Sequence, residues 1–436
     1  MEQEQRHLHK NNAVSVDFWE LSPLDLIHLD ELILDLPTEK TLVFKAVQEI
    51  PRQVGFFHGE VDDGKKIINF ISTEDKSFFG SIIDMLEHKV YQFQPKADGK
   101  MHVIKKTVSD FIDHDDKLSA QQLNLNRNKT QLSIFEGNEG TNSDLGDVID
   151  VMIVWTKTSE CRNSGLIEDC ILTAVTKSNM MGKIRLAIEE TNSAFIRSGI
   201  GTRLRLVYAY LHPTYQESDL ATSLNHLTDG HDGVLDDVHE KRAKYGADAV
   251  SLWIDSIACG LGWIGPFKEF MFSVVNYSCA TGYFSFGHEL AHNIGCKHDR
   301  GTEDKCNEND IPSYGYRDHN SAFRDIMAYD CVPGQCDNNA EHLCSRLQRF
   351  SNTYVLYEGR ALGDDRNNCA RHINSKLSIV ASYFARKTDE ELATLRAFET
   401  DQERSEIPET KCKESKSHCN RDDLCCSHIC RWRQCQ

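Results

Sequence analysis

The stretch HELAHNIGCKHD, residues 288–299, decides the fold. On a helix, His288 and His292 lie one turn apart and project from nearly the same side, so two imidazoles can bind one zinc ion. Glu289, next to the first of them, can reach a water on the metal without binding the metal itself. The spacing therefore predicts a helix that carries two metal ligands and a general base.

The residues after this helix complete the predicted metal site. Gly295 follows His292 by three positions, where a glycine can end the helix and turn the chain at positive φ. The turned chain then brings His298 back as a third ligand. Three protein ligands leave a fourth position open for water, which is the arrangement of a catalytic rather than a structural zinc. We therefore predict one catalytic Zn²⁺; a Ca²⁺ ion is compatible with the chain, but no motif indicates one.

The stretch resembles the pattern H-E-x-x-H-x-x-G-x-x-H of the metzincin metallopeptidases at every fixed position. Asp299, directly after the third histidine, is typical of the reprolysin (adamalysin) branch. Residues 325–329, DIMAY, resemble the methionine turn of the family. This implies that Met327 packs beneath the three imidazoles without binding the metal. Tyr329 matches the Met-x-Tyr of the astacin and serralysin branches, so it is either a catalytic participant or a packing residue.

The resemblance implies a fold and an activity. The expected fold is an α/β (α+β) metzincin catalytic domain over residues 147–387, with a twisted, mainly parallel sheet and an active-site helix. The expected activity is that of a zinc-dependent endopeptidase acting on proteins, with Glu289 as general base and Tyr329 as a candidate for stabilising the oxyanion. The competing interpretation is a toxin-like or receptor-binding protein, in which a C-terminal module carries the function and the metzincin domain is a scaffold.

Within residues 147–387 the apolar patterning predicts strands that alternate with helices. Strands are expected at 148–155, 204–211, 247–254 and 272–277, and helices at 181–198, 235–245 and 375–387. The Gly-rich segment 259–265 resembles the edge strand above the metzincin cleft; an ordinary turn is the alternative. Because an edge strand has unpaired backbone groups, an extended protein or peptide substrate can add to it as another strand.

Residues 1–146 are predicted to form a β-rich, prodomain-like region and a linker; an independent β domain is the alternative. Strands are expected at 41–47, 66–71, 78–83, 90–95 and 101–104. No cysteine precedes Cys161. A prodomain cysteine therefore cannot bind the zinc, as it does in many reprolysin zymogens. The polar stretch 119–147 is the expected linker and cleavage region.

The C-terminal part is predicted to consist of a charged linker, residues 388–410, and a small disulfide-rich module, residues 411–436. The cysteines of the module are Cys412, Cys419, Cys425, Cys426, Cys430 and Cys435. Their spacing resembles the inhibitor cystine knot (knottin) of small toxins and inhibitors. The knottin pattern would pair Cys412 with Cys426, Cys419 with Cys430, and Cys425 with Cys435, although sequence alone permits about fifteen pairings. A zinc knuckle is the alternative; as a knottin, the module could bind a surface target.

Composition restricts the class of protein. The chain has 436 residues and a formal net charge of −18, which argues against nucleic-acid binding. No apolar run approaches the length of a membrane span, so no transmembrane segment is expected. The sixteen cysteines fall as ten up to Cys369 and six in the C-terminal module. These even counts predict disulfides and an extracellular location.

Two further expectations concern the cysteines and the N-terminus. Cys331, Cys336, Cys344 and Cys369 are expected to staple the loops after the third histidine, with the pairing open. Residues 1–7 contain no signal-peptide core, so we expect an incomplete or processed start of a secreted protein.

Overall fold

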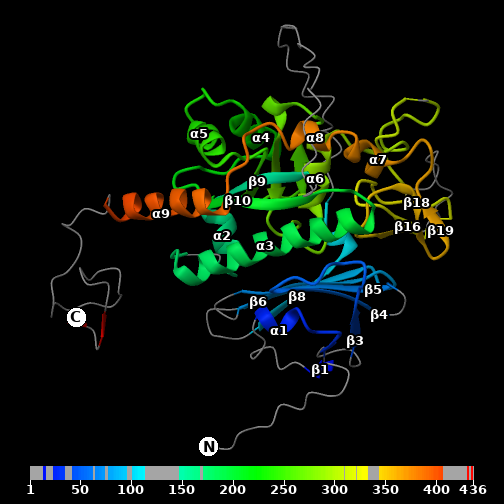
Figure 1. Ribbon diagram of the computed structural model, residues 1–436, viewed down its shortest axis with the longest axis horizontal. Coiled ribbons are helices and arrows are strands. Elements are labelled where there is room, and N and C mark those ends of the chain that lie inside the picture. Colours follow the sequence, from blue (N-terminus) through cyan, green and yellow to red (C-terminus); the bar gives the residue numbers. More distant parts are fainter. Residues whose placement is uncertain are drawn as a thin grey trace, which may run out of the picture. The chain divides into compact units, whose positions relative to one another are not determined.

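The computed structural model describes residues 13–15, 23–34, 42–61, 64–73, 77–95, 101–112, 147–166, 170–308, 310–320, 322–331, 343–405, 430–431 and 434–435. The chain divides into two compact units, residues 1–385 and 386–436. The first unit contains an N-terminal sheet and an α/β part that carries the histidine stretch (Figure 1). No helix within the described ranges has the length and hydropathy needed to cross a membrane.

The N-terminal sheet has eight strands in sequential order, which agrees with the β-rich region predicted there. They are β1 (Ala13–Ser15), β2 (Glu31–Leu34), β3 (Leu42–Ala46), β4 (Phe56–Val61), β5 (Lys66–Ser72), β6 (Phe78–Asp84), β7 (Lys89–Pro95) and β8 (Met101–Thr107). A short helix α1 (Pro23–Leu26) follows β1, and a 3₁₀ turn η1 (Val108–Asp110) follows β8. Alternate apolar residues of β6 pack on opposite faces: Phe78 and Ile82 in the core of the sheet, Phe79 against the α/β part.

The α/β part is built on a five-stranded sheet of order β10-β9-β11-β13-β12. Its parallel strands are β9 (Val148–Trp155), β10 (Arg203–Leu211), β11 (Ala249–Ile254) and β13 (Phe272–Asn276). At the edge, β12 (Gly260–Gly262) pairs antiparallel with β13. Every residue of β9 and β11 is buried, as expected of strands covered on both faces. The predicted mainly parallel sheet is present, and the Gly-rich segment forms its edge.

Helices pack on this sheet. They are α2 (Lys157–Asn163), α3 (Ala174–Arg197), α4 (Leu220–Thr228), α5 (Asp236–Tyr245), α6 (Ser285–Ile294), α7 (Cys369–Asn374) and α8 (Leu377–Val380). The long helix α3 runs between the N-terminal sheet and the five-stranded sheet (Figure 1), and its Leu186 packs against Phe79 of β6. Because α3 contacts both sheets, it joins the N-terminal region to the part that carries the histidines.

Short β pairs lie in the loops after α6. They are β14 (Lys297–Asp299) with β15 (Tyr314–Gly315), β16 (Phe323–Arg324) with β17 (Ser345–Arg346), and β18 (Asn352–Tyr357) with β19 (Arg360–Leu362). This loop-rich region holds the third histidine and the methionine turn.

Two predicted helices differ from the observed ones. α3 begins at Ala174 rather than at residue 181, because Thr173 caps it by accepting a hydrogen bond from the N–H of Thr176 (3.2 Å). Of the helix expected over 375–387, only residues 377–380 are helical, as α8; α7 ends at Asn374, and no helix covers 381–387.

The reason for the second error is an unrecognised cap. The side chain of Asn368 accepts a hydrogen bond from the N–H of Arg371 (2.9 Å), so α7 starts ahead of the expected helix. The disulfide of Cys369, the first residue of α7, fixes that start to the end of α6.

Disulfides stabilise the α/β part, as the even cysteine count predicted. The pairs are Cys161–Cys170, Cys259–Cys279, Cys296–Cys369 and Cys331–Cys344; Cys306 is also disulfide-bonded. Of the four loop cysteines, Cys331 and Cys344 pair with each other, Cys369 pairs with Cys296, and Cys336 lies outside the described residues.

The second unit contains the helix α9 (Asp389–Ser405) and two short strands, β20 (Cys430–Arg431) and β21 (Gln434–Cys435), which pair antiparallel. α9 lies within the predicted charged linker. Cys412, Cys419, Cys425 and Cys426 lie outside the described residues, so the cystine knot and its pairing stay predictions.

Candidate metal centre

Three imidazoles meet at one point of the first unit. The Nε2 atoms of His288 and His292 are 3.1 Å apart, those of His292 and His298 3.0 Å, and those of His288 and His298 3.3 Å. Nitrogens bound to one tetrahedral zinc at about 2.0–2.1 Å stand about 3.3 Å from one another. The three predicted ligands are therefore brought together with the spacing that one metal ion requires.

The second nitrogen of each ring lies against an oxygen acceptor. The Nδ1 contacts are His288 to the Ile326 carbonyl (2.9 Å), His292 to the Cys296 carbonyl (2.7 Å), and His298 to Oε1 of Glu303 (2.9 Å). Carbonyl and carboxylate oxygens only accept, so these contacts favour a proton on each Nδ1 and a lone pair on each Nε2. Glu303 was not identified from sequence, because its role depends on how the loop after His298 folds.

The environment of His288 favours its neutral form. Burial, together with the neighbouring His292 and Arg346, holds the pKa of His288 well below its ordinary value. A neutral imidazole is the form that binds a metal. Arg346, with Nη2 3.0 Å from Nδ1 of His288, was not singled out in the sequence, and no local motif marks it.

The end of α6 follows the sequence prediction. Gly295 has φ of +110° and caps the helix, and a Cβ there would meet Nε2 of His372 at 2.6 Å. The N–H groups of Gly295 and Cys296 both bind the carbonyl of Ala291 (3.1 and 2.9 Å). The glycine thus turns the chain toward β14, which carries His298.

Glu289 is buried against the edge strand. A Cβ at Gly260 would lie 2.5 Å from Oε1 of Glu289, and one at Gly262 would lie 3.1 Å from Oε2. The two glycines of β12 therefore let the backbone of the edge strand approach the carboxylate. Sequence inspection found the strand and the carboxylate separately, but missed that the glycines are needed for their contact.

Asn293 fixes α6 to the edge of the sheet. Its Nδ2 donates to the carbonyls of Trp263 and Phe272, each at 2.9 Å. Close by, the N–H of Gly265 donates to the carbonyl of His292 (2.9 Å). These bonds hold the helix that bears the histidines in register with β12 and β13.

The methionine turn lies directly next to the first ligand. Met327 is completely buried, and the carbonyl of Ile326 contacts His288. The buried carboxylate of Asp325 accepts from the N–H groups of Ala328 (2.8 Å) and Ser351 (2.8 Å), while burial raises its pKa to about 6. Asp325 therefore fixes the turn through backbone bonds, a role that the sequence did not reveal.

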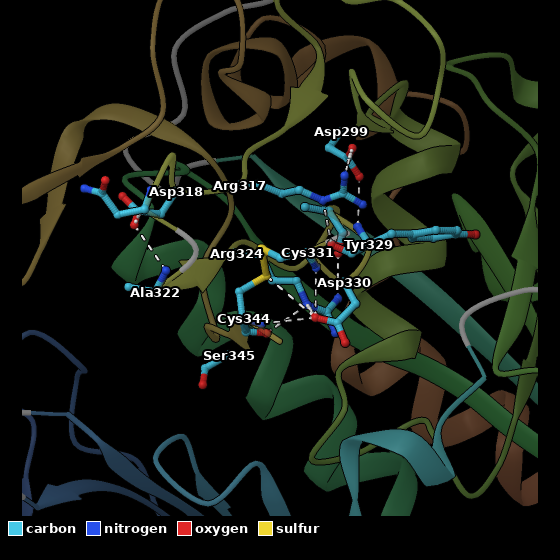
Figure 2. The surroundings of a disulfide bond; sticks show 12 residues. Asp299, Arg317, Asp318, Ala322, Arg324, Tyr329, Asp330, Cys331, Cys344 and Ser345 are labelled. Carbon is cyan, nitrogen blue, oxygen red and sulfur yellow. Dashed lines mark hydrogen bonds and ion pairs between the residues drawn. A yellow bond between two sulfur atoms is a disulfide. The ribbon is translucent and has the colours of Figure 1, made fainter. Parts of the chain in front are cut away.

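Asp299, the residue after His298, lies against Arg317 and the backbone of Tyr329 (Figure 2). Asp299 and Arg317 form a buried ion pair at 2.9 Å, and Oδ2 of Asp299 accepts from the N–H of Tyr329 (3.0 Å). The ring of Tyr329 projects away from this pair and lies beside His298, with centroids 4.3 Å apart. The structure therefore brings Tyr329 to the histidine cluster.

Comparisons with known proteins agree with this geometry. Residues 153–342 match the reprolysin-type description of metallo-peptidase family M12. A peptidyl-Asp metalloendopeptidase of Stenotrophomonas maltophilia is 28% identical over 74% of this chain and 72% of its own length. One of Xanthomonas campestris is 34% identical over 47% of each chain, and another of S. maltophilia is 32% identical over 47% of this chain and 48% of its own.

The match to family M12 begins within β9 and includes the histidine stretch, and the relatives are metalloendopeptidases by name. Together with the convergent histidines, these findings identify the activity of the α/β part. Residues 153–342 are similar to the reprolysin-type metallopeptidases of family M12, and the chain is a metalloendopeptidase.

Proposed function

We propose that the metal is zinc, that His288, His292 and His298 hold it, and that the chain is a secreted endopeptidase. The observation that carries this proposal is the set of three Nε2 atoms 3.0–3.3 Å apart, each on a ring whose other nitrogen faces an acceptor. An all-nitrogen donor set suits zinc better than calcium or magnesium, which prefer oxygen.

The residues around the site have separate roles in peptide hydrolysis. Bound zinc supplies Lewis acidity to a water molecule and to the scissile carbonyl group. Glu289 accepts the proton of the attacking water and later delivers it to the leaving amine. Tyr329, beside His298, donates a hydrogen bond to the developing oxyanion. Met327 provides a rigid apolar support under the ligands.

The substrate chain adds to β12 in extended form. Support comes from the position of β12 at the edge of the sheet and from the contact of its glycines with Glu289. Backbone pairing along such an edge supplies affinity, while side-chain pockets supply selectivity. Because three relatives are named peptidyl-Asp metalloendopeptidases, we assign this chain a preference for peptide bonds next to aspartate.

The N-terminal sheet acts as a prodomain. Support comes from residues 111–112, which lie at the start of the edge strand: the N–H of Cys259 donates to the carbonyl of Ile112 (2.8 Å). Ile112 also pairs with Ala258 in the parallel sense. A segment bound here competes with substrate for the same backbone edge. The C-terminal module is assigned, from its cysteine spacing, to binding of a surface target.

The test is cleavage of casein by the full chain before and after limited proteolysis in the stretch 119–147, with and without a zinc chelator. We expect cleavage by the processed chain that the chelator abolishes and added zinc restores. Glu289→Gln should bind one zinc per chain and lose cleavage by several orders of magnitude. Cleavage that survives removal of all metal, or full activity of the Glu289 variant, would contradict the mechanism.

A further inference from the structure

The third histidine differs from the other two in the group that its outer nitrogen contacts. Nδ1 of His298 lies 2.9 Å from Oε1 of Glu303, whereas the outer nitrogens of the two helical histidines contact backbone carbonyl groups. We propose that Glu303 is a positioning residue, which holds His298 in its metal-binding orientation and increases the affinity for zinc through its negative charge. This inference rests on the proposed function, in which the three histidines hold zinc.

A short turn presents the carboxylate to the histidine. The N–H of Glu303 donates to the carbonyl of Asp299 at 3.1 Å. The side chain of Asp299 accepts from the N–H of Thr302 (2.9 Å) and from its hydroxyl group (2.8 Å). The same hydroxyl oxygen accepts from Nη2 of Arg317 at 3.1 Å, and Arg317 forms the buried ion pair with Asp299. The turn that carries Glu303 is therefore anchored on a buried ion pair.

The third ligand needs a partner of its own because the helix does not position it. His298 lies on β14, after the chain has turned at Gly295, and its ring is partly exposed. The ring of Tyr329 packs beside it, but such packing does not determine which ring nitrogen faces the metal. The bond to Glu303 does, and it orders the ring before the metal binds, so less side-chain entropy is lost on binding.

A carboxylate does more than a carbonyl group at this position. Hydrogen bonds to an ionised acceptor are roughly twice as strong as those between neutral groups. A carboxylate on the outer nitrogen also makes the metal-facing nitrogen a stronger donor to the metal. The side chains of His298 and Glu303 are only 14% and 17% exposed, so water screens the negative charge only in part.

Glu308 provides a matched control in the same loop. Its carboxylate pairs with Lys305 at 2.6 Å and is about half exposed. Glu308→Gln therefore removes the same charge from the same loop, but from a carboxylate that is paired with a lysine rather than with a metal ligand.

The experiment measures the dissociation constant for zinc in the full chain, by competition with a chelator of known affinity, and the thermal midpoint of the zinc-free chain. Glu303→Gln keeps the shape of the side chain and one oxygen acceptor but removes the charge. We expect its dissociation constant for zinc to rise by about 10- to 100-fold, with the thermal midpoint of the zinc-free chain unchanged. Glu303→Ala, which also removes the acceptor, should weaken zinc binding at least as much.

The control Glu308→Gln should bind zinc within about twofold of the wild type, because an exposed ion pair contributes little. An unchanged dissociation constant in Glu303→Gln overturns the inference. So does a loss of affinity that comes with a lower thermal midpoint of the zinc-free variant, because Glu303 would then act on the folding of the loop. If the wild type binds no zinc, or if His298→Ala binds zinc as the wild type does, the proposed function itself fails.

Discussion

At the scale of single residues, the buried carboxylate of Asp299 holds two parts of the site together. Asp299 is buried, pairs with Arg317, and binds the backbone of Tyr329. Removing one member of a buried ion pair typically costs about 3–5 kcal/mol, because the remaining charge loses its partner. Asp299 thus fixes both the third ligand, its neighbour in sequence, and the tyrosine that follows the methionine turn.

The role of Tyr329 can be separated from its packing by removal of one oxygen. In Tyr329→Phe the ring beside His298 stays, but the hydroxyl that would stabilise the oxyanion is absent. We expect kcat to fall by roughly 10- to 1000-fold, with KM and the thermal midpoint nearly unchanged. Steady-state kinetics and thermal melts of the zinc-loaded chain measure both. A normal kcat would assign Tyr329 to packing alone.

At the scale of secondary structure, the site depends on the contact between α6 and β12. The helix carries His288, Glu289 and His292. The strand has glycines at positions 260 and 262, so no side chain separates its backbone from Glu289. Asn293 joins the two elements by bonds to the carbonyls of Trp263 and Phe272. The position of Glu289 relative to the edge strand is therefore a property of this pair of elements.

Gly260→Ala tests this contact. The new methyl group would lie 2.5 Å from Oε1 of Glu289, so the carboxylate or the strand must move. We expect kcat/KM to fall by at least about tenfold while zinc stays bound, since misplacement by about 1 Å is costly in catalysis. Gly201→Ala is the control, because the nearest atom to its Cβ is 3.8 Å away. Equal activity of both variants would mean that the glycine contact has no catalytic importance.

At the scale of the whole molecule, the N-terminal sheet and the metallopeptidase share a buried polar interface. Ser81 of β6 donates to Glu190 of α3, and the N–H of Gly282 donates to the same carboxylate (2.9 Å to Oε2). Phe111, after β8, stacks on Tyr283 with ring centroids 4.2 Å apart. The interface thus reaches from the centre of α3 to the start of the edge strand.

Phe111→Leu tests whether this stacking restrains the unprocessed chain. The substitution keeps an apolar side chain but removes the aromatic pair, which is worth about 0.5–1.5 kcal/mol. We expect cleavage of a short peptide by the intact chain to rise several-fold, mainly through a lower KM. Phe93→Leu, in the core of the same sheet, should leave KM unchanged. A similar rise in both variants would point to general loosening of the sheet.

The buried carboxyl group of Glu190 should make the free energy of unfolding depend on pH. Burial raises the pKa of Glu190 to about 8, against an ordinary value of 4.5. A carboxyl group with a raised pKa stabilises the fold fully below the unfolded pKa, and this contribution is lost as pH rises through about 8. Glu190→Gln cannot titrate. The free energy of unfolding of the wild type relative to this variant should therefore fall by on the order of 2 kcal/mol between pH 5 and pH 7.

Urea unfolding of both proteins at the two pH values measures this difference, and the comparison cancels the shared groups that do not interact with Glu190. Lys183, also on α3, has its pKa lowered to about 7 by burial and raised by the charge of Glu190, so the difference reports Glu190 together with Lys183. If the free energy of unfolding of the wild type relative to Glu190→Gln rises with pH or does not change with pH, Glu190 is ionised in the folded chain.

The sequence by itself determined the parts of this protein that depend on short-range pattern. The spacing of His288 and His292 and the glycine at position 295 predicted the histidine cluster, because a helix and its termination are properties of neighbouring residues. The apolar runs likewise located the parallel strands and the N-terminal β region. The predicted helix bounds were wrong where a side-chain cap sets the start of the helix, as Thr173 does for α3 and Asn368 for α7.

Only the tertiary structure decided how these parts meet. Arg346 contacts His288 across 58 positions of sequence, and the carbonyl of Ile112 meets the N–H of Cys259 across a far longer separation. Such contacts arise from the packing of whole elements, and a pattern of adjacent residues does not contain them. The sequence therefore predicted which three histidines come together, whereas the fold decided what lies beside these histidines and beside the edge strand.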